Sequence, residues 1–175
     1  MKTIRNLFLL VLAGLIMTSC GASYQESKAR RAAEKEAERQ AILAALDKAD
    51  FQLDVTRIIP KGYPSRESLG EYSLRLEGDV VTTRLPYIGD SHEATYGSDE
   101  ISIVFKKEKV KLIKDFSDAA KGEYRYRFAG GEGPTRWTVD LQIYDNGSAL
   151  IGCRGSGSRY ISFYANLVLP KDHEE

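Results

Sequence analysis

The fold is decided by residues 137–153, which read Trp137-Thr138-Val139-Asp140-Leu141-Gln142-Ile143-Tyr144-Asp145-Asn146-Gly147-Ser148-Ala149-Leu150-Ile151-Gly152-Cys153. The first eight residues alternate apolar and polar side chains, which is the pattern of a strand with one buried face. The pair Asn146-Gly147 predicts a tight hairpin with a type I′ turn, in which both central residues take a positive φ. A second strand-like run follows the pair and ends at Cys153. The stretch therefore predicts two antiparallel strands joined by a short turn.

The same alternation recurs in four other segments, residues 51–55, 72–76, 101–105 and 124–128. Turn-forming residues punctuate them, and strands recur roughly every 8–12 residues without a helical pattern between them. Residues 51–169 are therefore predicted to form an all-β domain, an antiparallel sandwich or small barrel of about eight or nine strands.

Two glycine-rich runs in this region are interpreted as loops. The run at residues 130–133 lacks the Lys-Ser/Thr pair and the strand-to-helix context of a phosphate-binding loop, so a hairpin loop is expected there. Gly152, Gly155 and Gly157 predict a second loop, placed before the last strand.

Residues 20–50 have a different character, because strong helix formers and charged pairs dominate them. Oppositely charged residues stand four apart, as in Glu26 with Arg30, and Ser23 is a suitable N-cap. The segment predicts a solvated helical spacer of up to ~40 Å, with a coiled coil or partner-binding helix as the alternative. Only the last turns, with Ile42, Leu43 and Leu46, carry enough apolar bulk to dock on a core.

The first nineteen residues resemble an export signal that ends at Cys20. Lys2 and Arg5 form a basic start, and residues 7–17 form an apolar run too short to cross a bilayer, which takes about 20 residues. The small residues before Cys20 are typical of a lipobox, although Met17 stands where leucine is usual. We therefore expect removal of residues 1–19 and lipidation of Cys20; an ordinary secretory peptide or an uncleaved segment is the alternative.

Lipidation of Cys20 would make a membrane one partner of the protein. Acyl chains contribute about 0.8 kcal/mol per buried CH₂, so two or three chains anchor a protein stably. Gly21 after the cysteine gives no retention signal, which favours the outer membrane. No acidic cluster follows Cys20, which favours the face toward the periplasm. Residues 170–175 are interpreted as a polar tail.

Composition narrows the function classes. The chain has 25 basic and 25 acidic residues, and removal of residues 1–19 takes away two basic ones, which leaves 23 against 25. A near-neutral chain gives no case for a nucleic-acid partner. If Cys20 carries lipid, Cys153 has no intrachain partner, and it is expected to be a small buried residue rather than a reactive thiol.

Catalytic chemistry has few candidates in this sequence. His92 lies in the long loop of residues 89–100 with Asp90, Glu93 and Asp99, but their spacing matches no known ligand motif. We therefore expect no catalytic residue, no cofactor and no metal site. An envelope hydrolase or metal-dependent enzyme that uses the 89–100 loop is the alternative.

Several blocks of the β region are similar to a family of bacterial lipoproteins common in Bacteroidetes, known as domain of unknown function 4251. The blocks are Pro60 with Gly62, residues 72–79, residues 85–89, Tyr96-Gly97, residues 144–149, and Arg159 before Ile161-Ser162-Phe163. The resemblance runs from about Phe51 to Leu169 and implies no activity, substrate or cofactor. Ile88 departs from it, since the family tends to an aromatic residue there.

Aromatic residues beside the long loop are the remaining signal for binding. Tyr87 and Tyr96 flank this loop, and rings that carry a hydroxyl suit a ligand cleft or a partner surface. We expect any site at Tyr87, His92, Tyr96 and Arg159. The sequence thus predicts a lipid-anchored cell-envelope protein with a non-catalytic binding or accessory role, its ligand a small apolar or peptidic molecule or an envelope protein.

Overall fold

The computed structural model describes residues 2–87, 102–132, 135–157 and 160–169, with side chains from residue 24 onward. One helix, α1 (Lys2–Lys48), precedes the strands, and a short 3₁₀ helix, η1 (Ala119–Lys121), interrupts them. The strands are β1 (Asp50–Pro60), β2 (Arg66–Glu67), β3 (Ser73–Glu77), β4 (Val80–Pro86), β5 (Ser102–Lys109), β6 (Ile113–Asp115), β7 (Glu123–Gly130), β8 (Trp137–Tyr144), β9 (Ser148–Gly155) and β10 (Ile161–Val168).

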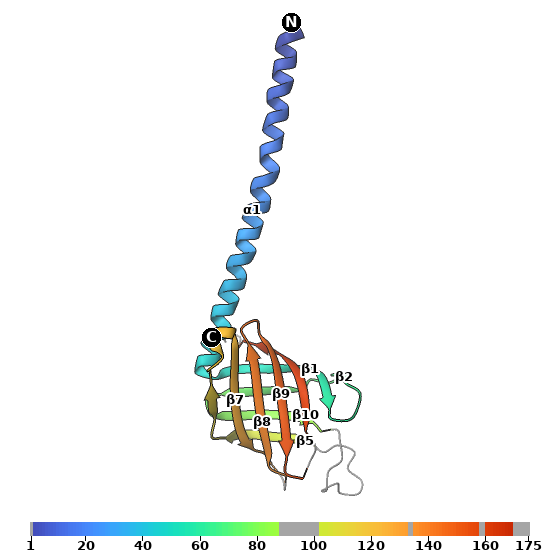
Figure 1. The fold of residues 1–175 in the computed structure, drawn as a ribbon, viewed down its shortest axis with the longest axis vertical. Helices are drawn as coiled ribbons and strands as arrows, with labels where there is room; N and C mark the ends of the chain where they lie inside the picture. The colour runs from blue at the N-terminus through green and yellow to red at the C-terminus, as the bar shows by residue number, and fades with distance from the viewer. Residues whose placement is uncertain (1, 88–101, 133–134, 158–159, 170–175) are drawn as a thin grey trace, which may run out of the picture. The chain divides into compact units, whose positions relative to one another are not determined.

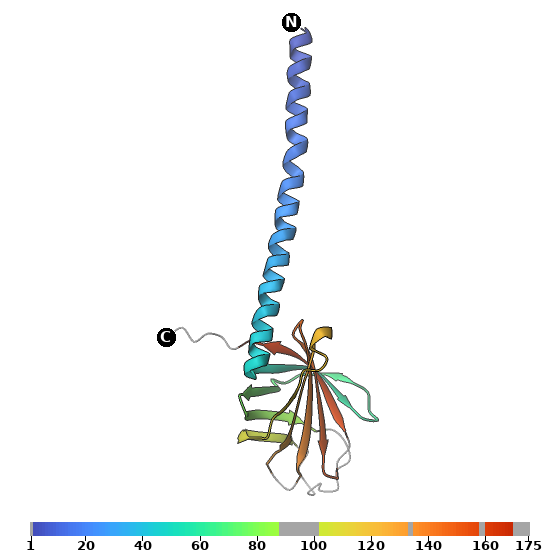
Figure 2. The ribbon, with the colours of Figure 1, turned by 60° about the vertical axis from the view of Figure 1, so that its left-hand side comes forward.

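All ten strands belong to one antiparallel sheet. Nine of them follow the order β5-β4-β3-β1-β10-β9-β8-β7-β6, and β2 pairs with β1 beside this path. The sheet curls so that β7–β10 cross in front of β1 and β5 at a steep angle, as Figures 1 and 2 show. The result is a half-barrel, which confirms the predicted all-β antiparallel class.

The half-barrel bends at strand irregularities. The pairing of β1 with β10 shifts register between Val55 and Arg57, and the pairing of β4 with β5 shifts between Val81 and Thr83. In β5 the second shift coincides with Lys107, which has a left-handed φ of 50°. Such bulges increase local twist and curvature, so they help one sheet to wrap around its own core.

The edge strand β5 meets the residues that follow β7 at one corner of the half-barrel. The Glu132 amide after β7 donates to the Val104 carbonyl of β5 at 2.9 Å, and the Gly131 amide donates to the Glu108 carboxylate at 2.9 Å. Lys106 and Glu132 form an ion pair there at 2.7 Å. These contacts join β5 to the end of β7.

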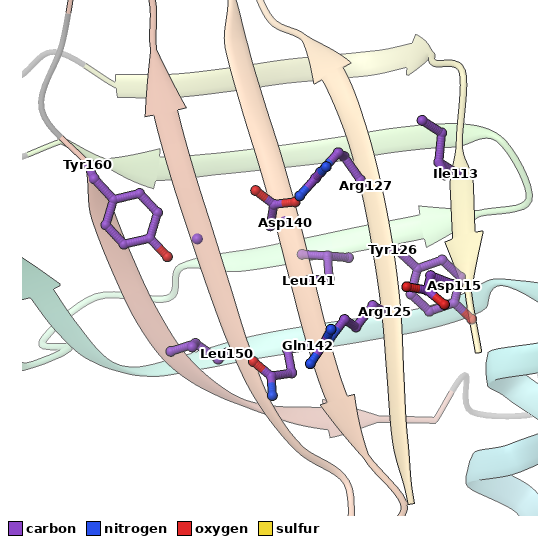
Figure 3. Close-up of a pocket in the computed structure, with 11 residues that line it drawn as sticks. Ile113, Asp115, Arg125, Tyr126, Arg127, Asp140, Leu141, Gln142, Leu150 and Tyr160 are labelled. Atoms are coloured by element: carbon purple, nitrogen blue, oxygen red, sulfur yellow. The ribbon is translucent and has the colours of Figure 1, made fainter. Parts of the chain in front are cut away.

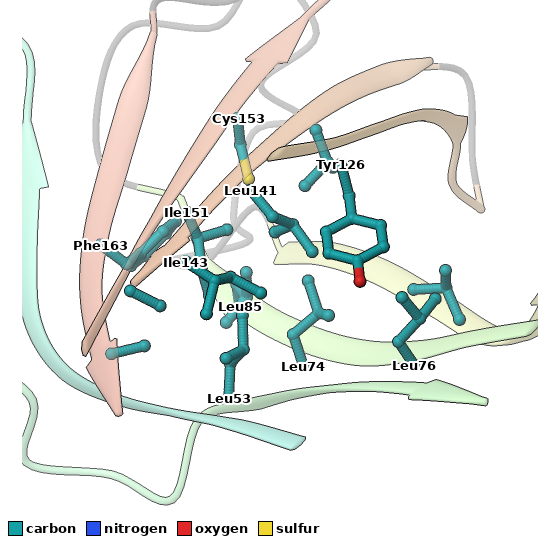
Figure 4. Packing of buried hydrophobic residues seen from close by; sticks show 14 of the residues in the cluster. Leu53, Leu74, Leu76, Leu85, Tyr126, Leu141, Ile143, Ile151, Cys153 and Phe163 are labelled. Carbon is teal, nitrogen blue, oxygen red and sulfur yellow. The ribbon is translucent and has the colours of Figure 1, made fainter. Parts of the chain in front are cut away.

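The core lies inside the curl and is built from the inward faces of the strands. Figure 4 shows leucines of β1, β3 and β4 opposite aliphatic residues of β8 and β9. Among the residues that the structure describes, six aromatic side chains are fully buried as well: Trp137, Tyr126, Phe51, Phe105, Phe128 and Phe163. Cys153 is 0% exposed, which confirms its predicted burial, and this burial raises the pKa of its thiol.

The end of α1 also belongs to the core. Residues 1–40 form one compact unit and residues 41–175 form another. The unit that contains the β domain therefore starts at residue 41, ten residues before the predicted boundary at residue 51. Ile42 and Leu46 are 4% and 0% exposed, and the Tyr126 hydroxyl donates to the Leu46 carbonyl. The final turns of the helix thus dock on the β domain, as their apolar bulk suggested.

The start of α1 differs from the prediction. The helix begins at Lys2, so Ser23 lies inside it instead of capping it. Residues 2–22 contain no proline and five leucines, and the helix continues through Gly14 and Gly21 in the full chain. Among the residues that the structure describes, no helix combines the length and apolar character that crossing a membrane requires.

The β8–β9 hairpin is present, but its turn is not type I′. Gly147 has a φ of 82°, whereas Asn146 is not among the non-glycine residues with positive φ. The Gly147 amide donates to the Tyr144 carbonyl at 2.9 Å, as in a type I turn followed by a left-handed glycine. The Asn146 side chain accepts from the Ser148 amide at 3.0 Å, which favours this three-residue loop.

Candidate functional site

A hollow of about 400 Å³ lies on the outer face of the strands β6 to β9. Strand register arranges its residues in two rows across the sheet. One row runs Ile113–Arg127–Asp140–Gly152, and the other runs Asp115–Arg125–Gln142–Leu150. Figure 3 shows Tyr160 at one end of this surface and Ile113 with Asp115 at the other. The two rows and Tyr160 make one surface, which we call the outer-face hollow.

The depth of the hollow depends on Gly152. A Cβ at this position would lie 2.2 Å from the Tyr160 hydroxyl, so only glycine leaves room for the ring to lie over β9. The Arg154 guanidinium lies 5.8 Å from the centre of the same ring and holds it by a cation–π contact. Gly152 lies inside β9 rather than in the predicted loop, and the tyrosine ring takes the place of the missing side chain.

Polar side chains in the middle of the outer-face hollow are already paired. Arg127 Nε donates to Asp140 Oδ1 at 2.5 Å, and Gln142 Nε2 donates to the Tyr144 hydroxyl at 2.7 Å. Arg125 forms an ion pair with Glu123, a half-buried residue at the start of β7. These pairs fix the positions of a guanidinium, a carboxylate and an amide before any ligand arrives.

The outer-face hollow has no net charge, because two arginines and two aspartates line it. The Ser117 amide donates a hydrogen bond to Asp115, which lowers the pKa of this carboxyl. The ion pair with Glu123 raises the pKa of Arg125. Burial raises the pKa of Tyr160, with a smaller effect of the nearby Cys153. At neutral pH the Asp115 carboxyl and the Arg125 guanidinium are therefore charged, and the Tyr160 phenol is protonated.

A second hollow, of about 390 Å³, lies on the outer face of β1 and β3–β5. Arg75, Arg84 and Lys106 line it together with the acidic Glu71. Arg75 forms ion pairs with Asp50 and Glu77, so part of its charge is already compensated. This hollow is more open, and its aromatic lining residue, Phe105, is 0% exposed and belongs to the core, so it is the weaker candidate.

The predicted site residues are only partly within the described chain. Tyr87 is 6% exposed, and its ring packs on Trp137 with the ring centres 5.3 Å apart. His92, Tyr96 and Arg159 lie outside the described residues, as does the 89–100 loop. Binding at these four positions stays a prediction. In the described ranges, no three histidine, cysteine or acidic residues gather as metal ligands would.

Part of the lining of the outer-face hollow could be predicted from the sequence. The alternation in residues 124–128 and 137–144 places Arg125, Arg127, Asp140 and Gln142 on outward faces. It could not show that the two strands pair with Arg127 opposite Asp140, because register depends on the turn between them. The sequence placed Tyr160 near a strand end, as it did several other tyrosines, but its position over the hollow depends on a glycine in a neighbouring strand.

The family model described as domain of unknown function (DUF4251) matches residues 33–167. The chain belongs to this family. The match spans both the β domain and the last turns of α1, which agrees with the packing of Leu46 in the core. No curated protein matches the chain. Family membership therefore supplies no activity for the outer-face hollow.

A solved structure supports the fold of this DUF4251 domain. It is the crystal structure of a DUF4251 family protein from Bacteroides eggerthii at 1.95 Å resolution, and it is similar to this chain with a TM-score of 0.53. The two sequences are 12% identical over 76% of this chain and 88% of that one. At this identity the likeness concerns the fold alone.

Proposed function

We propose that this protein is a lipid-anchored component of the cell envelope whose β domain binds a ligand in the outer-face hollow and catalyses no reaction. The observation that carries the binding role is the hollow itself, in which Tyr160 lies over Gly152 beside paired polar side chains. Its volume falls within the range of about 300–1,000 Å³ typical of ligand sites. Aromatic and apolar walls with a few oriented polar groups are also typical of such sites.

Native mass spectrometry of the full chain, extracted from cell envelopes in mild detergent, tests the binding role. We expect the wild-type protein to retain an extra mass and Tyr160→Ala to lose it. Tyr24→Ala is the matched control, because Tyr24 is 73% exposed in the helix and far from the hollow in sequence. A bare mass for the wild type, or an extra mass that Tyr160→Ala also retains, would contradict binding in the hollow.

The anchor and the location rest on the sequence. The basic start, the short apolar run and Cys20 support lipidation, and Gly21 supports transfer to the outer membrane with the domain in the periplasm. Fractionation of cells that carry Cys20→Ala tests this. The variant should leave the membrane fraction or accumulate as a precursor, and a membrane-bound, mature-sized variant would refute lipidation.

A further inference from the structure

We infer that the outer-face hollow recognises a neutral saccharide. The inference rests on the proposed binding function and names its ligand class. Three features of the hollow carry it: its charge balance, the pairing of the strands in its floor, and the combination of an aromatic wall with adjacent donors and acceptors.

Charge balance argues against ionic and purely apolar ligands. An anion that is attracted to Arg125 or Arg127 is repelled by the neighbouring Asp115 or Asp140. A cation that is attracted to the aspartates is repelled by the arginines in the same way. A hydrocarbon chain would strip water from these four charged groups without replacing their hydrogen bonds, which is costly. A neutral ligand with many hydroxyl groups avoids both penalties.

The floor of the hollow argues against an extended peptide. Peptides that join a sheet bind through backbone groups at a free strand edge. β6, which carries Ile113 and Asp115 at one end of the hollow, is the edge strand of the sheet, but the floor is formed by β7, β8 and β9, and each of these three strands pairs with a neighbour on both sides. Their backbone groups are therefore engaged in the ladder, and side chains alone are left to recognise a ligand.

Those side chains match the two faces of a sugar ring. Arg127 and Asp140 present a donor and an acceptor side by side, so neighbouring hydroxyls of one ring can accept from the first and donate to the second. Tyr160 and Leu150 provide an apolar surface for the C–H face of the ring. Tyr160 is held in place by the gap at Gly152 and by Arg154, so little ordering is needed on binding.

Calorimetric titration of the full chain with defined saccharides tests the inference. The detergent should be lauryldimethylamine oxide, which has no sugar headgroup to compete. The neutral probes are tri-N-acetylchitotriose and maltotriose, and the anionic comparison is sialyllactose. We expect at least one neutral probe to bind and sialyllactose to bind more weakly.

Four variants locate the binding. Tyr160→Ala and Asp140→Ala should each weaken it by about tenfold or more, since each removes a contact that the ligand needs. Tyr160→Phe keeps the ring and should lose less than Tyr160→Ala. Arg84→Gln, in the second hollow, should change nothing. Trp137 fluorescence, which reports a fully buried side chain, checks that each variant is folded.

The outcomes separate this inference from the proposed function. Neutral saccharide binding that falls in the Tyr160→Ala and Asp140→Ala proteins supports both. The inference is overturned if the affinity for neutral saccharides is unchanged in these two variants, or if the wild-type protein binds sialyllactose more tightly than the neutral probes. If neither neutral probe binds while the envelope-extracted protein retains a Tyr160-dependent mass, the saccharide class is wrong and the binding role stands. If no neutral probe binds and the protein retains no Tyr160-dependent mass, both the saccharide inference and the proposed binding function are wrong.

Discussion

Replacement of Leu46 by alanine tests whether the end of α1 is a structural part of the β domain. Leu46 is 0% exposed, and its carbonyl accepts the Tyr126 hydroxyl. Truncation of a fully buried leucine costs about 2–5 kcal/mol, because apolar contact is lost and a cavity remains. We take about 3 kcal/mol for Leu46→Ala. A domain of this size loses roughly 3–4 °C per kcal/mol, so the melting temperature should fall by about 10 °C.

Trp137 fluorescence is the appropriate assay, because this residue is the sole tryptophan and lies in the β domain core. It follows unfolding of the domain without a contribution from residues 1–40. Leu69→Ala is the matched control, since Leu69 is 100% exposed and its truncation should change the free energy of unfolding by less than about 0.5 kcal/mol. If Leu46→Ala is as mild as Leu69→Ala, the helix end does not belong to the core.

Three further predictions concern the half-barrel. Lys107→Gly should stabilise the protein by roughly 0.5–1 kcal/mol in denaturant unfolding, because an exposed residue at a φ of 50° loses its strain; destabilisation would contradict this. Glu108→Ala should cost about 1.5–3 kcal/mol by removing the charged acceptor of the Gly131 amide, with Glu108→Gln milder; equal losses would count against that hydrogen bond. Burial raises the pKa of Cys153 above 9.0 and of Tyr126 above 10.0, so the unfolded chain releases these protons first and stability falls as pH rises above about 9. Unfolding curves from pH 7 to 11 should show this fall, and Cys153→Ala should delay its onset to about pH 10; an unchanged onset would refute the thiol's part.

The alternation of side chains was enough to predict several of the strands. Trp137, Val139, Leu141 and Ile143 face the core as their spacing requires, and the pattern extends to β1, β3, β5 and β7. The choice between a sandwich and a barrel depends on curvature instead. That curvature involves bulges such as the one at Lys107, where a residue without a turn signal takes a left-handed conformation.

The turn and the helix show two other limits of local patterns. Asn146-Gly147 predicted a hairpin correctly but not its type, because Asn146 accepts from the Ser148 amide and Gly147 alone takes the positive φ. The apolar bulk of Leu46 suggested that the last turns of the helix dock on a core, but not that its carbonyl accepts a hydrogen bond from Tyr126, eighty positions away in sequence. Contacts of this range have no signature in either segment alone.

The candidate site was the least predictable part. Its rows combine residues from four strands, and its shape depends on Tyr160 lying over Gly152. A glycine in a strand signals a close approach of another group, but it does not name that group. Tyr87 was predicted as a binding residue because it lies beside a long loop; its ring packs on Trp137, and binding there stays a prediction.

Methyl NMR of the full chain tests most directly whether the outer-face hollow is the binding site. The leucine methyl groups are observed before and after addition of a lipid-free envelope extract. We expect the Leu150 resonances to shift, because this side chain lies in the hollow, while those of the exposed Leu69 do not. Unchanged Leu150 resonances, with or without shifts elsewhere, would contradict it.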